Sequence, residues 1–273
     1  MQTQHVLVVG DAHVDEHQSL DRFKALGKKI ETEQPDHVVF IGDFLSMNCL
    51  SDWDKNKRCK MENRRYHLEI AAGNKALDYA MSECRADVHY IEGNHEDRQS
   101  RYFDVDPTFL GTSSIKGDLH LADRGIEWVP YKSCLNIDGV SFTHIPITSL
   151  GKAIGNPNVA QKALKLFHNS VVFGHTHTLD HAAEHRHGSP HLNQALSVGC
   201  FFEHVDEYAQ GSLTNYWRGL VDLYIYDTNR FDFSTTSMRQ LYTQYSSPAG
   251  RGKSSTPVIR ISRATRRPQR PSK

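Results

Sequence analysis

The sequence predicts an α/β protein built on a mainly parallel sheet. Three short apolar runs, at residues 5–11, 37–43 and 87–97, each lead into a glycine followed by Asp or Asn. Leu20 and Phe23 begin a helical spacing between the first two runs, and a long helix is expected from Met61 to Cys84. Alternation of strands and helices indicates parallel strands joined by right-handed crossovers, with a site at their carboxyl ends.

The remaining elements follow in chain order. Ser19 is the expected N-cap of the first helix, and a hairpin is expected over residues 135–145 through the turn Asp138-Gly139. A helix is expected over 156–170, with Asn156 as its cap and Pro157 at its first position. The run "VVFGHTH" predicts one more strand, and a closing hairpin is expected over 219–227 and 231–238.

Composition limits the class of protein. The chain has 273 residues, enough for one large α/β domain, and no apolar run approaches the roughly 18 residues of a membrane span. The N-terminus does not have the pattern of a secretory signal. Five scattered cysteines without a CxxC pair argue against a disulfide framework or zinc knuckle, so we expect a cytoplasmic protein without a membrane partner.

Basic residues are concentrated in two segments, although the net charge is zero. Beyond about Tyr245, Ser, Pro, Gly and Arg dominate, which predicts a folded domain over 1–244 and a flexible basic tail over 245–273. The second segment is "DKNKRCKMENRR", residues 54–65. Each segment is either a solvated surface or a binding surface for a polyanion such as nucleic acid.

Five short segments end apolar runs with residues that ligate metals. They are "GDAH" with Asp11 and His13, "GD" with Asp43, "GNHE" with Asn94, "THIP" with His144, and "GHTH" with His175 and His177. Carboxylates, imidazoles and an amide oxygen suit Mn²⁺, Fe²⁺ or Zn²⁺. Seven ligands are too many for one tetrahedral ion and suit two ions that share a carboxylate, a pair able to clamp a phosphate and generate hydroxide. If "GHTH" is extended, its two histidines point to the same side and each can serve one ion.

These blocks resemble the signature of the calcineurin-like metallophosphoesterases. That signature reads D-x-H, G-D, G-N-H-[ED], H-x-P and G-H-x-H, and every block is present in order between Val6 and His177. The resemblance implies a single-domain, four-layer α/β/β/α sandwich with two divalent metal ions. It also implies hydrolysis of a phosphoester by a hydroxide held at that dinuclear centre. Mn²⁺ is the expected metal, with Fe, Zn and Mg as alternatives.

The resemblance also implies a role for each residue. His95 would protonate the leaving oxygen or steady the phosphate, and Arg98 would donate a bidentate pair to phosphate. The first metal would be held by Asp11, His13, Asp43 and His177, and the second by Asp43, Asn94, His144 and His175.

One block departs from part of the family. The Ser/Thr phosphatases read G-D-x-x-D-R-G where this chain reads "GDFLSMNCL", so the arginine expected there is missing, which argues against a protein phosphatase. The polar and basic segment that follows, with Trp53 and Tyr66 interleaved, is similar to the insert of phage-encoded members described as DNA nucleases. Arg64 and Arg65 are therefore expected to bind nucleic acid, in the host cytoplasm if the chain is phage-encoded. Exonuclease and endonuclease action are both open.

Two other activities are alternatives to the nuclease. A phosphomonoesterase or a small-nucleotide phosphodiesterase would use the same fold, and a nucleic-acid-binding protein would carry the metal site as a remnant. Two further groups are expected to be structural: Asp118 and His120 in a loop, and a polar hairpin around His187-Gly188 whose histidines are solvated. The histidines of this hairpin are His181, His185, His187 and His191.

Overall fold

The three strands predicted from the alternation of strands and helices are parallel neighbours in the first sheet, and a fourth parallel strand that was not predicted lies at its edge. The computed structural model describes residues 3–52, 54–185, 187, 192–203 and 214–246. The predicted closing hairpin adds two antiparallel strands beside the first of the four. In sheet order the strands are β11 (Arg230–Ser237), β10 (Gly219–Asp227), β1 (Gln4–Val9), β2 (His37–Phe40), β3 (Asp87–Ile91) and β4 (Ile126–Val129).

The second sheet is mixed. Its three central strands are parallel and its two outer strands are antiparallel to their neighbours. The predicted turn at Asp138-Gly139 joins its first two strands. In sheet order the strands are β5 (Leu135–Ile137), β6 (Val140–Thr143), β7 (Val171–Phe173), β9 (Leu192–Val198) and β8 (Leu179–His185).

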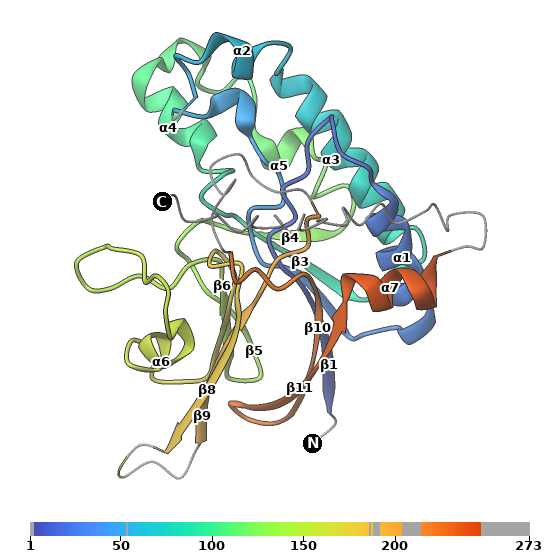
Figure 1. Cartoon of the computed structure of the whole chain (residues 1–273), viewed down its shortest axis with the longest axis vertical. Helices are drawn as coiled ribbons and strands as arrows, with labels where there is room; N and C mark the ends of the chain where they lie inside the picture. The colour runs from blue at the N-terminus through green and yellow to red at the C-terminus, as the bar shows by residue number, and fades with distance from the viewer. Residues whose placement is uncertain (1–2, 53, 186, 188–191, 204–213, 247–273) are drawn as a thin grey trace, which may run out of the picture.

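The two sheets lie face to face with helices on both outer sides (Figure 1), which confirms the four-layer sandwich. Side chains alternate along β1, so Val6 and Val8 pack between the sheets while Leu7 and Val9 pack against helices. Burying each such side chain contributes about 1.5–3 kcal/mol. The helices are α1 (Asp21–Glu33), α2 (Arg58–Met61), α3 (Tyr66–Met81), α4 (Arg98–Val105), α5 (Ile115–Asp118), α6 (Val159–Leu164) and α7 (Met238–Tyr245), with 3₁₀ turns η1 (Asn48–Leu50) and η2 (Pro107–Phe109).

Two predicted helices are shorter than expected. The helix predicted over 61–84 is α3, which spans only Tyr66–Met81, because Asn63 before it has a positive φ of 62° and separates it from the short α2. The helix predicted over 156–170 begins only at Val159, since Asn158 before it is left-handed and Pro157 is outside the helix. Neither backbone conformation continues an α-helix.

Three smaller predictions also need correction. The first helix begins at Asp21 after Leu20, so Ser19 is not its N-cap, although Ser19 Oγ accepts from Asp21 N at 3.2 Å. Asp118 lies at the end of helix α5 rather than in a loop. The last helix extends to Tyr245, one residue into the predicted tail, and residues 247–273 of that tail lie outside the described residues.

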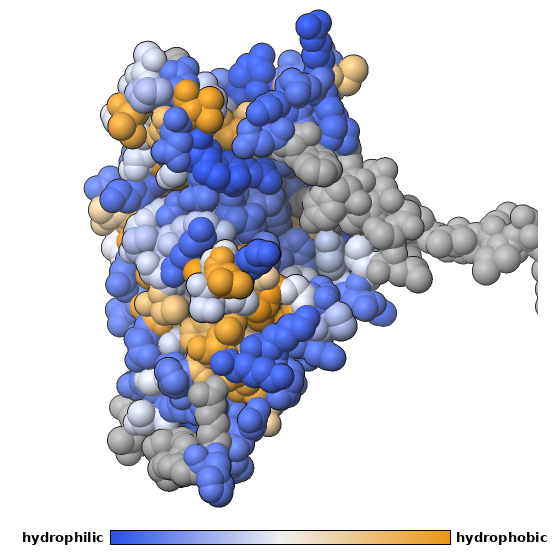
Figure 2. Space-filling model, turned by 90° about the vertical axis from the view of Figure 1, so that its left-hand side faces the viewer, coloured by the Kyte–Doolittle hydropathy of each residue, from blue (hydrophilic) through white to orange (hydrophobic). Residues whose placement is uncertain are grey.

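The surface facing the viewer in Figure 2 is mostly hydrophilic. Hydrophobic colour is gathered in two separate areas, at the top and in the lower half, with a hydrophilic band between them. Exposed apolar side chains include Val105, Leu110 and Leu150. Within the described ranges, no helix is both long and apolar enough to cross a membrane.

Candidate metal centre

Loops at the carboxyl ends of strands from both sheets bring the predicted ligands together. Six of the predicted ligands, together with His95, form three groups, and within each group the candidate ligand atoms lie within 4.8 Å of one another. The groups are Asp11, His13 and His177; His13, Asp43 and His95; and Asp43, His144 and His175. The seventh predicted ligand, Asn94, joins these groups through its side-chain oxygen, which lies 3.0 Å from His144 Nε2.

The first group contains one carboxylate and two imidazoles, all buried. His177 Nε2 lies 3.0 Å from Asp11 Oδ2 and 3.4 Å from His13 Nε2. Phe202 packs edge-on against both imidazole rings and limits where they can turn. Two imidazole nitrogens and a carboxylate oxygen that converge in this way fit one divalent transition-metal ion.

The group of Asp43, His144 and His175 is built around His144, which is fully buried. Its Nδ1 is 3.0 Å from the backbone oxygen of Ile41, a contact that directs Nε2 toward the other ligands. That Nε2 lies 3.4 Å from Asp43 Oδ2. This donor set fits a second divalent ion. Asp43 also belongs to the group with His13 and His95, so it lies between the two candidate ion sites.

Four of the predicted ligands have left-handed backbone conformations. The φ angles are 46° at His13, 48° at Asp43, 65° at His175 and 58° at His177. The segment "GHTH" is therefore bent, so the condition that it be extended is not met. The bend still sends the two histidines to different groups. Such conformations cost about 1–3 kcal/mol each and are typical of functional sites, where the surrounding structure holds them.

Two glycines leave no room for any other side chain beside these ligands. A Cβ on Gly93 would lie 2.1 Å from Asp43 N, and a Cβ on Gly42 would lie 2.5 Å from His144 Nδ1. Glycine is needed in the two sequence blocks because the loops pack directly against each other.

Glu96 supports the centre, a role that the sequence did not reveal. Its fully buried carboxylate accepts hydrogen bonds from the backbone N–H groups of Asp43 at 3.1 Å, Leu45 at 2.8 Å and Gly93 at 2.9 Å. Tyr90 Oη donates a fourth at 3.0 Å. Glu96 thereby ties the loop after β2 to the end of β3. The only sequence signal was its place in "GNHE".

The charges in the centre strongly affect one another. Burial raises the pKa of Asp43, but the imidazoles of His144 and His95 outweigh it and hold that pKa well below its usual range. Burial lowers the pKa of His144, whereas the charge of Asp43 raises it to about 9. Burial and then His144 lower the pKa of His175, which favours the neutral imidazole that binds metal.

His95 lies beside Asp43 with both ring nitrogens in contact. Its Nδ1 is 2.7 Å from the backbone oxygen of Ser46, and its Nε2 is 3.8 Å from Asp43 Oδ2. Its backbone N–H donates to Asp43 Oδ1 at 2.8 Å. Burial is the main cause that lowers the pKa of His95 to about 4. The ring is therefore held at the edge of the metal groups.

Arg98 lies next to His95, at the first residue of α4. Its Nη1 donates to the backbone oxygens of Ser46 at 2.9 Å and Met47 at 3.2 Å, and its Nη2 lies 3.2 Å from His95 Nε2. The structure thus brings Arg98 to the site, with part of the guanidinium engaged by the protein itself.

Arg64 and Arg65 lie in the turn between α2 and α3, which Figure 1 shows at the upper end of the molecule. Arg64 Nε donates to Lys60 O at 2.9 Å, and Arg65 Nη1 donates to Arg64 O at 2.8 Å. Arg65 is exposed. No contact joins either arginine to the three metal groups among the described residues.

The other residues that resemble metal ligands are structural in the described part of the chain. Asp118 accepts a hydrogen bond from Tyr66 Oη at 2.6 Å, and His120 is exposed. His181 and His185 are exposed on β8, in the predicted hairpin, whereas His191 lies outside the described residues.

One further group of potential ligands contains His5, Glu33 and Asp222. The ammonium of Lys29, itself buried, lies 2.6 Å from Glu33 and 3.1 Å from Asp222. His5 Nε2 lies 3.0 Å from Asp222. The lysine already supplies the positive charge, so this group is a buried ion-pair network.

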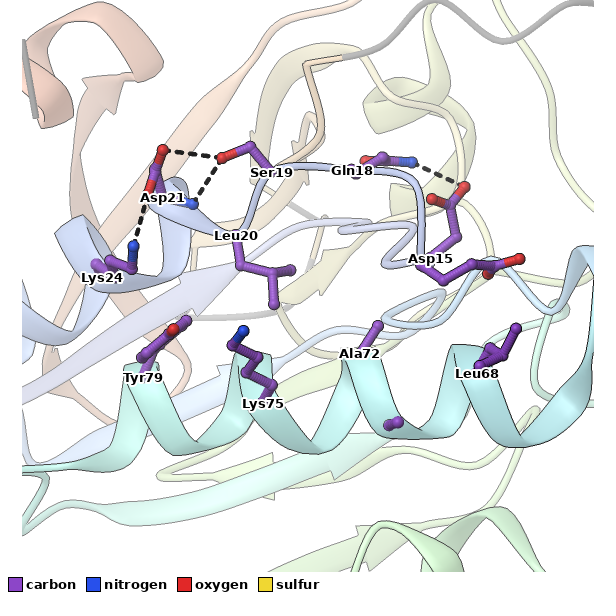
Figure 3. A pocket seen from close by; sticks show the side chains of 12 residues that line it. Asp15, Gln18, Ser19, Leu20, Asp21, Lys24, Leu68, Ala72, Lys75 and Tyr79 are labelled. Carbon is purple, nitrogen blue, oxygen red and sulfur yellow. Dashed lines mark hydrogen bonds and ion pairs between the residues drawn. The ribbon is translucent and has the colours of Figure 1, made fainter. Parts of the chain in front are cut away.

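A hollow of about 410 Å³ lies between the loop after β1 and helix α3 (Figure 3). Across it, Leu20 faces Ala72 and Lys75 of α3. Lys24 is paired with Asp21 at 2.8 Å on its rim. None of the seven predicted ligands lines this hollow, so it is separate from the metal centre.

A two-sheet α/β sandwich that gathers these donors where its strands end is the architecture of a metal-dependent phosphoesterase. The model of the family described as calcineurin-like phosphoesterase matches residues 4–179, more than half of the chain. The chain therefore belongs to the calcineurin-like phosphoesterases, as the sequence blocks predict. Membership implies a dinuclear centre of divalent ions, and the groups described above are candidates for it.

Two solved structures are similar to the chain at low identity. A dimetal phosphatase from Danio rerio is 12% identical with a TM-score of 0.42, and the match covers 86% of this chain and 96% of that one. A purple acid phosphatase, PPD1, from yellow lupin (Lupinus luteus) seeds is 12% identical with a TM-score of 0.40, over 87% of this chain and 52% of that one. No curated protein matches the chain.

Proposed function

We propose that this phosphoesterase is a nuclease that hydrolyses phosphodiester bonds of DNA. The observation that carries the proposal is the position of Asp43. It belongs to two of the three groups, one with His13 and His95 and the other with His144 and His175. In this assignment Asp43 is shared by two ions. Asp11, His13 and His177 complete the first set, and Asn94, His144 and His175 complete the second.

Two bound divalent ions supply charge neutralisation for the phosphate and a water of lowered pKa. Mn²⁺ is the preferred ion, since carboxylate, imidazole and amide oxygen donors suit it. His95 is assigned to the leaving oxygen. It lies 3.8 Å from Asp43 and is not needed to complete either ligand set.

The preference for a nucleic-acid substrate is supported by the segment that follows Asp43. Ser46 and Met47 stand where the protein phosphatases of the family carry Asp and Arg, which disfavours a phosphoprotein substrate. Helix α2 and the turn after it carry Arg64 and the exposed Arg65. Cations that make no contact with the reacting centre suit a long polyanion better than a small ester.

The test is a substrate panel assayed with Mn²⁺. It contains p-nitrophenyl phosphate, bis-p-nitrophenyl phosphate, cyclic nucleotides, and single- and double-stranded DNA. The proposal expects cleavage of DNA and of the small diester, abolished by a chelator and by Asp43→Asn prepared in the same way as a control for contaminating nucleases. Far better cleavage of the monoester would assign the protein as a phosphomonoesterase. DNA binding without cleavage of any ester would make it a binding protein.

A further inference from the structure

The guanidinium of Arg98 and the imidazole of His95 share one hydrogen-bond acceptor. Arg98 Nη1 and His95 Nδ1 lie 2.9 Å and 2.7 Å from the backbone oxygen of Ser46. Arg98 Nη2 also lies 3.2 Å from His95 Nε2. One arginine therefore contacts both the carbonyl that holds one side of the ring and the nitrogen on its other side.

The chemistry of these groups fixes the direction of each hydrogen bond. A carbonyl oxygen only accepts, so His95 Nδ1 carries the proton and donates to Ser46. A guanidinium only donates, so His95 Nε2 accepts from Arg98. Both contacts select the same tautomer and the same ring orientation, and they leave Nε2 unprotonated 3.8 Å from Asp43 Oδ2, so the ring must take up a proton at Nε2 before it can act as an acid on the leaving oxygen.

Arg98 contacts the loop of the second block from helix α4, whereas the protein phosphatases of the family carry an arginine within that block itself. Those members of the family carry an arginine within the second block, at the position of Met47 here. In this chain the oxygen of Met47 accepts from Arg98 Nη1 at 3.2 Å, and Arg98 belongs to α4. The guanidinium thus lies against the loop whose own arginine is missing.

We infer that Arg98 is a positioning residue, which holds the ring of His95 with Nε2 directed into the metal centre. This inference rests on the proposed role of His95 in hydrolysis. It is an alternative to the expectation that Arg98 binds the substrate phosphate through a bidentate pair, since three of the five N–H donors of the guanidinium already serve two carbonyl oxygens and the imidazole. Arg98 acts on the reaction through His95.

The test is a double-mutant cycle on the small ester that the wild-type protein hydrolyses best. Arg98→Ala should lower kcat by about 10²-fold, the usual cost of a displaced catalytic group, with little change in KM or in bound metal. In a His95→Ala background, Arg98→Ala should have almost no further effect, since there is no ring left to position. Added guanidinium ion should restore part of the activity of Arg98→Ala and none of that of His95→Ala.

Two controls separate positioning from general damage. Arg239→Ala removes an exposed arginine on α7 and should leave kcat and the thermal midpoint unchanged. If Arg98→Ala does not fold, Arg98→Lys enters the same cycle, because a single ammonium cannot reach both the carbonyl oxygens and the imidazole.

Three results would overturn the inference. They are losses that multiply in the double variant, a raised KM with unchanged kcat in Arg98→Ala, and full activity of His95→Ala. The last result would remove the role of His95 as well. Because the cycle uses a small ester, a failure to cleave DNA would refute the nuclease proposal and leave the test of Arg98 intact.

Discussion

Replacing Glu96 by Gln tests how Asp43, the proposed shared ligand, is held in place. The buried carboxylate of Glu96 accepts from four donors, three backbone N–H groups and the hydroxyl of Tyr90. Both carboxylate oxygens must therefore accept. An amide has the same shape but offers one accepting oxygen, and its other end is a donor.

The cost can be worked out from these four hydrogen bonds. With the amide oxygen on the Oε2 side, the Glu96→Gln variant would retain the bonds from the N–H groups of Asp43 and Gly93. On the other side, the hydroxyl of Tyr90 can rotate and accept, but the N–H of Leu45 would face another donor. One orphaned buried donor costs about 1–3 kcal/mol, and the remaining bonds lose the strength that the charge gave them. Removal of the buried charge offsets part of this cost, because burial and then Asp43 raise the pKa of Glu96 to about 7, so we expect the free energy of unfolding to fall by about 1–3 kcal/mol.

Urea unfolding after treatment with a chelator measures this loss without a contribution from metal binding. Tyr90→Phe is the matched control, because it removes one neutral donor and leaves Glu96 with the three backbone donors, at about 0.5–1.5 kcal/mol. Metal retention should fall in Glu96→Gln, since the loop that carries Asp43 is loosened. A loss of stability no greater than that of Tyr90→Phe, together with wild-type metal retention, would refute this account of Glu96.

Four further outcomes are expected. Asp43→Asn should abolish activity and metal retention together, measured by metal analysis, because a neutral amide bridges two cations poorly; two ions per chain in an active variant would contradict the shared ligand. His95→Ala should lower kcat by about 10²–10⁴-fold with metal content unchanged, and loss of metal would make His95 a ligand. Replacing Arg64 and Arg65 by Ala should weaken the salt dependence of binding to duplex DNA. The slope of log affinity against log salt concentration should fall in magnitude by about 0.9 for each phosphate that is no longer neutralised. An unchanged slope would place these residues outside the DNA interface. Burial and the nearby His89 lower the pKa of His37. On acidification the unfolded state therefore binds a proton before the folded state does, and the free energy of unfolding should fall as the pH drops below about 6.5. His37→Gln should reduce this pH dependence in urea titrations, and a pH profile identical to that of the wild type would disprove the assignment.

The fold, and the clustering of the candidate ligands in one place, could be predicted because both depend on short-range patterns. Each ligand directly follows an apolar run, and parallel strands bring their carboxyl ends to one edge of a sheet. The left-handed conformations at His13 and Asp43 could not be predicted in the same way, because a positive φ is uncommon for any residue other than glycine, although Asp and His adopt it more often than most. Packing between two loops imposes them, and that packing exists only in the folded protein.

The helix boundaries failed for a related reason. Asn63 and Asn158 are each compatible with a helix in the sequence, yet both take left-handed conformations and end the helical run. Asparagine tolerates this conformation better than most residues, so the choice is decided by tertiary contacts.

The missing arginine of the second block marks the limit of prediction from separate sequence blocks. Met47 at that position indicates correctly that the loop lacks its own guanidinium. It does not indicate that Arg98, from the start of α4, contacts the oxygens of Ser46 and Met47 and the ring of His95. A sequence block records which residues an element carries, whereas the chemistry of the centre depends on which groups meet in space. The absence of the motif arginine therefore argues against a protein phosphatase, but it does not leave the centre without a guanidinium, because Arg98 lies beside the ring of His95.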